Sequence, residues 1–384
     1  MIAAIALFAL ALSTEAATPD QHPQASHHVS GATAQAESFD EIATAAMKAW
    51  NEKRDDDAMA LFRKGLKLRP DWNEGLWYLG AILYDHDQYR DARDQLRHYL
   101  SLNPKNGEGW ALVGMSDYKL REFTHAAEDL HRAVQDGLGG HWDLTGPSYY
   151  FSALLLTRDG HFAESSQLLY ELKDGDDGRV RVNVPLEVPM GLNALGYAML
   201  PEEVPADLVP LARQAGVATF ARFEGRPGEA KNIFEQLLKQ YPNEQGLHFQ
   251  LGYLLLQEHS ADGVGEMQKA IALAPYDFEP QLSLADYFND TGQYDQALAD
   301  VDKALALDPT VVSAHVTRGR ILNAKGDTAG AIAEFETAKK AGAPDNRVLW
   351  ELARAYRKVG RQEEAAQVMK ELQQQNAQPQ TPKQ

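Results

Sequence analysis

Residues 73–106 read NEGLWYLGAILYDHDQYRDARDQLRHYLSLNPKN, and the main features of this stretch return along the chain at steps of 34 residues. The stretch holds an apolar residue followed by glycine, then an alanine four residues before another apolar residue, and finally a proline. These features are Leu79-Gly80, Ala92-x3-Leu96 and Pro104. One step earlier lie Ala58-x3-Phe62 and Pro70, and one step later lie Val113-Gly114 and Ala126-x3-Leu130. Self-similarity at a fixed period indicates a repeat architecture.

The spacing within each unit predicts two helices packed against each other. Apolar residues recur at three- and four-residue intervals, which places them on one face of a helix. Small residues at the middle of the first helix and the start of the second let the two helices approach closely, and the late proline ends the second helix. A single unit cannot bury both of its faces, so neighbouring units must stack. We therefore predict an all-α solenoid of helix-turn-helix units.

The recurring residues resemble the tetratricopeptide repeat, whose pattern is W-x2-L-G-x2-Y, A-x3-F, A and P. The resemblance covers about four-fifths of the chain and implies an α-solenoid, or superhelix, that binds other proteins. In the second half it rests on Ala230-x3-Phe234 with Pro242, Leu251-Gly252 with Pro275, Ala297-x3-Val301 with Pro309, Gly319 with Ala331-x3-Phe335, and Leu352-Ala353 with Ala365-x3-Met369.

The register of these residues gives the expected domain organisation. It places three repeats in 39–140, a degenerate repeat in 146–179 and five further repeats in 211–379, with an insertion or spacer at 180–210 between them. Alternating apolar residues from Val180 to Val188 predict a short extended or hairpin segment there, followed by a helix near Met190 to Leu200. Insertions in repeat arrays often map to one face. The segment is thus either a specificity element or a spacer.

The first residues indicate export. Ile2 to Leu12 is an unbroken apolar run followed by small residues, which predicts a signal peptide over 1–16, cleaved after Ala16 with Thr14 at position −3. No Lys or Arg precedes the run, which departs from the usual pattern, and the run is too short for a transmembrane anchor. Residues 17–38 have the composition of a flexible linker. We therefore expect a periplasmic or secreted protein.

Composition excludes several classes of function. The formal net charge of −18 repels nucleic acid, whose binding depends on cationic neutralisation of phosphate. The chain has no cysteine, which rules out disulfides, thiol catalysis and iron–sulfur clusters. It also lacks the H-E-x-x-H, G-x-S-x-G and G-x-x-x-x-G-K-[ST] motifs. We predict no catalytic site, no cofactor and no bound metal, and read His22, His27 and His28 as linker residues.

The resemblance implies which residues face a partner, because positions 2, 5, 9 and 12 of the first helix line a groove in this family. Two alternatives are open for the first three repeats. Their residues form an aromatic and thioether trough that binds a partner, or each ring packs on the next repeat. The candidates at these positions are Met47, Trp50, Trp77, Tyr84, Met115 and Tyr118.

The last three repeats carry basic and amide residues at the same positions. They would receive an acidic segment or a C-terminal carboxylate, or would form a solvated face with ion pairs between repeats. These candidates are Asp286, Asn289, Arg320, Asn323, Arg354 and Arg357. The function that follows is a non-catalytic scaffold for protein or peptide binding in the cell envelope or outside the cell. The alternative is binding of carbohydrate or cell-wall polymer through the aromatic trough.

Overall fold

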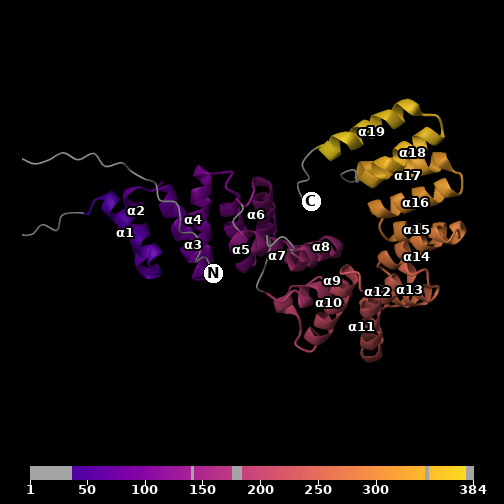
Figure 1. The fold of residues 1–384 in the computed structure, drawn as a ribbon, viewed down its shortest axis with the longest axis horizontal. Helices are drawn as coiled ribbons and strands as arrows, with labels where there is room; N and C mark the ends of the chain where they lie inside the picture. Colours follow the sequence, from indigo (N-terminus) through magenta and orange to yellow (C-terminus); the bar gives the residue numbers. More distant parts are fainter. Residues whose placement is uncertain (1–36, 140–141, 175–183, 342–345, 378–384) are drawn as a thin grey trace, which may run out of the picture. The chain divides into compact units, whose positions relative to one another are not determined.

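A computed structural model describes residues 37–139, 142–174, 184–341 and 346–377. The predicted signal peptide, nearly all of the predicted linker and residues 180–183 of the predicted hairpin lie outside these residues. The described part contains nineteen α-helices, one short 3₁₀ helix and no strand (Figure 1), which confirms the predicted all-α fold. None of the helices in these ranges combines the length and the hydropathy that a membrane-spanning segment requires.

The chain divides into two compact units, with a boundary inside one helix. Unit 1 comprises Met1–Leu155 and Asp174–Val182, and unit 2 comprises Leu156–Lys173 and Asn183–Gln384. In unit 1, successive helices pack as pairs, and each pair packs on the next. The pairs are α1 (Phe39–Asn51) with α2 (Asp55–Leu68), α3 (Asn73–Asp85) with α4 (Tyr89–Leu102), and α5 (Gly107–Lys119) with α6 (Phe123–Asp136), followed by α7 (Trp142–Arg158).

Unit 2 begins with the end of α7, followed by α8 (Phe162–Asp174) and α9 (Glu187–Leu195), and α9 packs on α10, the first helix of the pairs that follow. The short 3₁₀ helix η1 (Pro201–Glu203) follows α9. The pairs are α10 (Val209–Phe223) with α11 (Pro227–Gln240), α12 (Gln245–Gln257) with α13 (Asp262–Leu273), α14 (Glu279–Asp290) with α15 (Tyr294–Leu307), α16 (Val312–Ala324) with α17 (Thr328–Ala341), and α18 (Asn346–Lys358) with α19 (Gln362–Ala377).

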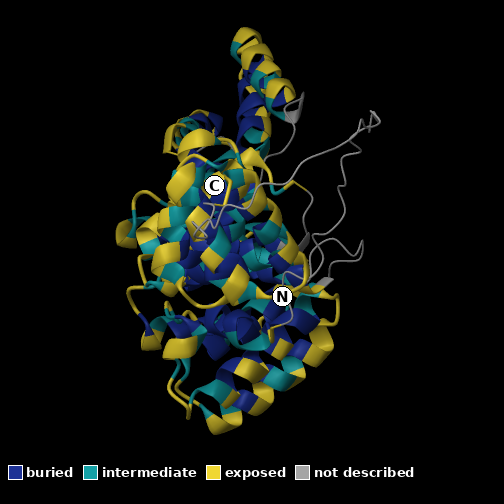
Figure 2. Ribbon diagram, turned by 90° about the vertical axis from the view of Figure 1, so that its left-hand side faces the viewer, coloured by how far each residue is buried: buried dark blue, intermediate teal, exposed yellow. Residues whose placement is uncertain are grey.

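The residues of the recurring pattern form the core between the helices. Phe62, Phe234 and Phe335, which stand at the end of the A-x3-F motif, are all 0% exposed. Along the helices, Figure 2 shows buried residues alternating with exposed ones, as expected when one face of each helix packs on its neighbours. Packing of neighbouring pairs, as the repeat pattern predicts, therefore holds each unit together.

The turn inside most pairs needs a left-handed residue. Four pairs use a non-glycine residue with positive φ, namely Lys53, Asp87, Arg121 and His259. The corresponding turns before α8, α11, α15, α17 and α19 use glycine, as at Gly292 with a φ of 77°. Because this conformation costs a non-glycine residue about 1 kcal/mol, the surrounding helices must hold it in place.

Helix α9 replaces part of the predicted extended segment. The described chain bends at residue 184 and becomes helical at Glu187, so Val188 lies in a helix and not in a strand. The following helix was predicted near Met190 to Leu200, but α9 ends at Leu195, where Gly196 adopts a φ of 72°. The reason is packing between helices. Leu192, Ala194 and Leu195 of α9 are buried in the core of unit 2, mainly against α10.

Two glycines allow α9 and α10 to approach each other closely. A Cβ atom on Gly191 of α9 would lie 1.6 Å from the carbonyl oxygen of Ala212, and one on Gly216 of α10 would lie 1.8 Å from that of Glu187. Each helix therefore presents a glycine to the backbone of the other. The end of α7 is joined to α8 and α9 by buried hydrogen bonds, in which Thr157 Oγ1 lies 2.8 Å from Ser165 Oγ and from Asn193 Oδ1.

A buried carboxylate joins α4 to α5 in unit 1. The Asp117 side chain of α5 is 0% exposed and lies between two arginines of α4. Arg93 Nη1 donates to Oδ1 at 3.1 Å, and Arg97 Nη2 donates to Oδ2 at 2.9 Å. Arg93 also bonds Glu122 at 3.0 Å, while Arg97 lies 3.6 Å from Asp129 of α6. Burial raises the pKa of Asp129 to about 6.

Candidate partner-binding surface

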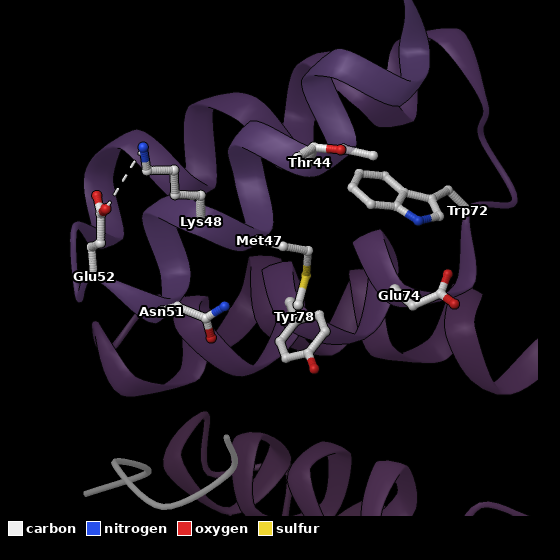
Figure 3. A pocket seen from close by; sticks show the side chains of 9 residues that line it. Thr44, Met47, Lys48, Asn51, Glu52, Trp72, Glu74 and Tyr78 are labelled. Carbon is white, nitrogen blue, oxygen red and sulfur yellow. Dashed lines mark ion pairs between the residues drawn. The ribbon is translucent and has the colours of Figure 1, made fainter. Parts of the chain in front are cut away.

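Unit 1 has an open hollow between α1 and α3. Met47 of α1 and Tyr78 of α3 point toward one another across it (Figure 3). Its volume is about 720 Å³, and polar side chains surround the two apolar ones, including the Lys48–Glu52 pair at 4.0 Å. The lining residues are Ala43, Thr44, Met47, Lys48, Asn51, Glu52, Trp72, Glu74 and Tyr78.

Most of the residues proposed for the aromatic trough pack against other rings. The ring centres of Trp50 and Tyr78 are 5.7 Å apart. Those of Trp77 and Tyr99, on the second helix of the same pair, are 5.3 Å apart. Tyr84 lies 5.4 Å from Tyr89. The side chains of Trp50, Trp77 and Tyr84 are half-buried, so these contacts take up much of the area that a partner would need.

Met115 and Tyr118 require a correction, because their side chains lie in the core. Met115 is 1% exposed and Tyr118 is 4% exposed. Helix α7 covers this end of α5, and the ring of Phe151 lies 4.5 Å from that of Tyr118. Among the six residues proposed for the trough, Met47 is the one that lines the hollow.

Sequence reasoning missed Tyr78, Thr44 and Asn51, which line the hollow together with Met47. Thr44 and Asn51 lie three and four residues from Met47, on the same side of α1. Their helical spacing from Met47 was the available signal. Tyr78 follows directly after the proposed Trp77, and only the observed rotation of α3 shows which of the two rings faces the hollow.

In unit 2, three of the proposed residues form a continuous row from α14 to α18. Asp286 of α14 accepts a hydrogen bond from Thr317 of α16 at 3.0 Å. The guanidinium group of Arg320 on α16 lies 3.7 Å from a carboxylate oxygen of Asp286 and 3.7 Å from one of Asp290. Asn323 of α16 accepts from Lys358 of α18 through its side-chain oxygen at 2.9 Å. We call Asp286, Arg320, Asn323, Arg354, Arg357 and Lys358 the α14–α18 row.

The remaining proposed residues lie beside these contacts. Arg354 is 60% exposed, lies over the Trp350 ring at 5.3 Å and is 3.8 Å from Glu351. Arg357 is exposed. Asn289 is half-buried, and its side-chain oxygen has no hydrogen-bond partner among the described residues. Ion pairs between repeats, which were one of the two predicted alternatives, are thus present at Arg320, whereas Arg357 makes none with the described side chains.

Charge changes sign along the row. The α14 end carries Asp286 and Asp290, and burial raises the pKa of Asp286. The α18 end carries Arg354, Arg357 and Lys358. Beside the acidic end, α12 and α14 enclose a hollow of about 310 Å³, lined by Tyr253, Leu256, Gln257, His259, Ser283, Asp286, Tyr287 and Asp290.

Two histidines of unit 2 are engaged in the fold. His248 Nδ1 lies 2.6 Å from Glu266, and its Nε2 lies 2.9 Å from the carbonyl oxygen of Pro242. His315 makes the same two contacts with Glu334 and Pro309, at 2.7 and 3.0 Å. Each ring therefore joins the first helix of a pair to its second helix and to the preceding proline. Within the described ranges, no group of three His, Asp or Glu residues is placed to hold a metal ion.

Helix pairs that stack in series, with a row of polar side chains running across successive first helices, define an α-helical repeat protein. Residues 217–244 match the family model of the tetratricopeptide repeat, and residues 280–381 match that of the auxiliary subunit of N-terminal acetyltransferase A. The chain is a tetratricopeptide-repeat protein, as its recurring residues predicted. Proteins of this class are protein-interaction scaffolds.

Individual proteins resemble the chain more distantly. Cellulose synthase 2 operon protein C of Komagataeibacter xylinus is 24% identical over 335 residues, which cover 79% of this chain. The match spans 25% of that relative's own length. Among solved structures, MamA from Desulfovibrio magneticus RS-1 is 16% identical with a TM-score of 0.40, covering 44% of this chain and 96% of MamA. The Cut9–Hcn1 structure of the APC/C is 13% identical with a TM-score of 0.42, covering 87% and 86%.

Proposed function

We propose that the chain is a non-catalytic scaffold that holds a segment of a partner protein along the α14–α18 row. The observation that carries this proposal is the continuity of the row. Side chains from three successive first helices contact one another, through Asp286 and Thr317, Arg320 and Asp290, and Asn323 and Lys358. An extended segment lying across these helices meets polar groups at each repeat.

Charge complementarity supports an acidic partner segment. Arg354, Arg357 and Lys358 lie close together at the α18 end, in a chain whose formal net charge is −18. Arg357 has no ion pair with any described side chain, and Arg354 approaches one carboxylate at 3.8 Å. Guanidinium groups form bidentate hydrogen bonds with carboxylates, so this cluster suits acidic side chains of a partner.

Reversing the charge of this cluster tests the proposal. In the double variant Arg354→Glu/Arg357→Glu, we expect the recovered amount of the main partner to fall about tenfold, because like charges then face its acidic segment. The measurement is affinity capture of the tagged chain from its own cells, with the partner quantified by mass spectrometry.

The matched control is Lys340→Glu/Lys370→Glu, which makes the same change in net charge at exposed positions on second helices of the same unit. Recovery of the partner should be unchanged in this control. Equal recovery with both double variants would refute a role of the row in partner binding.

The carbohydrate alternative loses its main support in unit 1. It required a row of accessible rings, but Trp50, Trp77, Tyr84 and Tyr118 each lie next to another ring, and none of the four is exposed. A ring that stacks on a sugar must present a free face. The rings of unit 1 therefore give carbohydrate binding no support.

We propose further that the scaffold is exported. The apolar run from Ile2 to Leu12 and the small residues after it support this location. The mature protein is then expected to begin at Ala17, and Leu7→Arg/Leu10→Arg, which breaks the apolar run, should leave the chain uncleaved in the cytoplasm. The measurement is the intact mass of the protein in the periplasmic and cytoplasmic fractions. Recovery of uncleaved protein in the cytoplasm without any substitution would contradict export.

A further inference from the structure

Arg222, in the last turn of α10, has an unusual environment. Its guanidinium carbon lies 4.6 Å from the centre of the Phe223 ring and 5.6 Å from that of Tyr253 on α12. The Phe223 ring stacks in turn on Tyr170 of α8 at 5.0 Å. Rings of α10 and α12 therefore lie against this cation, and a ring of α8 supports one of them.

No carboxylate of the described residues pairs with Arg222. Its Nε atom is inaccessible to solvent and has no hydrogen-bond partner in the part of the chain that the structure describes. The acidic group nearest in sequence, Glu224, is bound instead by Lys173 at 2.8 Å and by Arg226. Asp286 and Asp290, in the hollow beside Tyr253, face Arg320. In a chain with 55 acidic residues and 37 lysines and arginines, an unpaired and partly buried arginine calls for a physical explanation.

Burial of the Arg222 guanidinium group is unfavourable, and its packing against aromatic rings offsets this only in part. Removal of a guanidinium group from water is unfavourable unless its N–H groups find acceptors. Burial accordingly lowers the pKa of Arg222. Contact with two rings attracts the charge, but it supplies no acceptor in the plane of the guanidinium group, where the donors point.

The repeat register places Arg222 among the proposed partner-binding positions. Counted from the small residue Ala218, it stands at position 12 of its first helix, where Asn289, Asn323 and Arg357 stand in later repeats. It is also joined to the α12–α14 hollow, because Tyr253 both contacts Arg222 and lines that hollow. Gln257 and Ser283 lie in the same hollow and supply groups that can hydrogen-bond a backbone.

We propose that Arg222 binds the carboxylate of a glutamate or aspartate side chain in the partner segment, which then runs through the α12–α14 hollow toward the α14–α18 row. The carboxylate supplies the two in-plane acceptors that the guanidinium fork lacks, and the Phe223 and Tyr253 rings exclude water from the pair. This inference rests on the proposed function, since it takes the first helices of unit 2 as the partner-binding surface.

The test uses the full chain and a fluorescent oligoglutamate peptide with blocked ends. Binding is followed by fluorescence anisotropy at low ionic strength, where screening is weak. We expect Arg222→Met to weaken binding about tenfold and Arg222→Lys, which keeps the charge without the fork, to weaken it less. Arg213→Met is the matched control, because Arg213 is exposed on the same helix, and it should leave the affinity unchanged. An oligoglutamine peptide with a free carboxyl end tests whether a terminal carboxylate is the true ligand.

Urea unfolding separates a binding role from a structural one. A residue kept for binding at a cost to the fold should leave the unfolding midpoint of Arg222→Met unchanged or higher. A lower midpoint, unchanged oligoglutamate affinity, or equal binding of the oligoglutamine peptide with the free carboxyl end would each overturn the inference.

The double variant Arg354→Glu/Arg357→Glu distinguishes this inference from the proposed function. If oligoglutamate affinity depends on Arg354 and Arg357 but not on Arg222, the inference about Arg222 fails and the row remains the binding site. If affinity depends on Arg222 alone, Arg222 is a carboxylate site and the role of the row fails.

Discussion

Replacing Asp117 by alanine is expected to lower the free energy of unfolding of unit 1 by about 3–5 kcal/mol. The Asp117 carboxylate is fully buried and bonds Arg93 at 3.1 Å and Arg97 at 2.9 Å. Its removal leaves two cations of α4 facing each other without their shared counter-charge, and Arg93 is largely buried. The measurement is urea unfolding of the full chain, followed by circular dichroism.

Two further variants separate the charge from the hydrogen bonds and from surface effects. Asp117→Asn keeps the shape of the side chain and one acceptor. We therefore expect its free energy of unfolding to lie between those of the wild type and Asp117→Ala. Asp94, which is 63% exposed and lies 3.4 Å from Arg93, is the control. Asp94→Ala should change stability by less than about 0.5 kcal/mol. Similar stabilities of Asp117→Ala and Asp94→Ala would show that the buried pairs do not hold α4 to α5.

The second large effect is expected where α9 meets α10. Gly191→Ala should destabilise unit 2 by about 3 kcal/mol, because the added methyl group would lie 1.6 Å from the Ala212 carbonyl oxygen. Neither helix can relieve this contact by a change of rotamer, since the clash is with backbone. The helices must separate, and the buried side chains Leu192 and Leu195 lose contacts as they do. The effect runs against helix propensity, which favours alanine over glycine by about 1 kcal/mol.

Gly216→Ala is expected to behave like Gly191→Ala, because its methyl group would lie 1.8 Å from the Glu187 carbonyl oxygen. Gly228 of α11 is the control, since a Cβ atom there would meet nothing within 4 Å. Gly228→Ala should be neutral or stabilise the protein by up to about 1 kcal/mol. The shift in the unfolding transition of each variant can be compared directly, and a Gly191→Ala protein as stable as Gly228→Ala would rule out the close approach.

The repeated part of the fold could be predicted from the sequence because its signal is redundant. Residues such as Phe62, Phe234 and Phe335 recur at fixed places relative to an alanine, and the structure buries each of them. A single helix pair would carry weak evidence. Recurrence over several pairs fixes the helical period, the small residues at close contacts and the positions of the turns together.

The sequence could not show which neighbour covers a given face. For Tyr118 the sequence left open whether the ring lines a groove or packs on the next repeat, and in the structure α7 covers it through Phe151. Similarly, alternating valines near residue 180 favoured an extended chain, but the last of them, Val188, lies in α9. Helix α9 owes its position to contact with α10 through Gly191 and Gly216, and such long-range contacts leave no periodic signal.

The members of the α14–α18 row largely followed from register, whereas the pairing of their side chains depended on the packing of the helices. The register identified Asp286, Arg320 and Asn323, which the structure brings together. Arg222 stands in the same register. It has no ion pair with a described carboxylate because Glu224, Asp286 and Asp290 pair with other cations. Those pairings are decided by helix packing and cannot be read from spacing.

Nearest-neighbour contact between helix pairs has a mechanical consequence. From α10 to α19 each pair packs mainly on the one before and the one after, so a pull on the ends of this region is transmitted through the pairs in series. The pair with the weakest interfaces yields first, while the others remain folded. A partner bound across several first helices would clamp those pairs together, and such a region would extend in steps under load and stiffen where it is occupied.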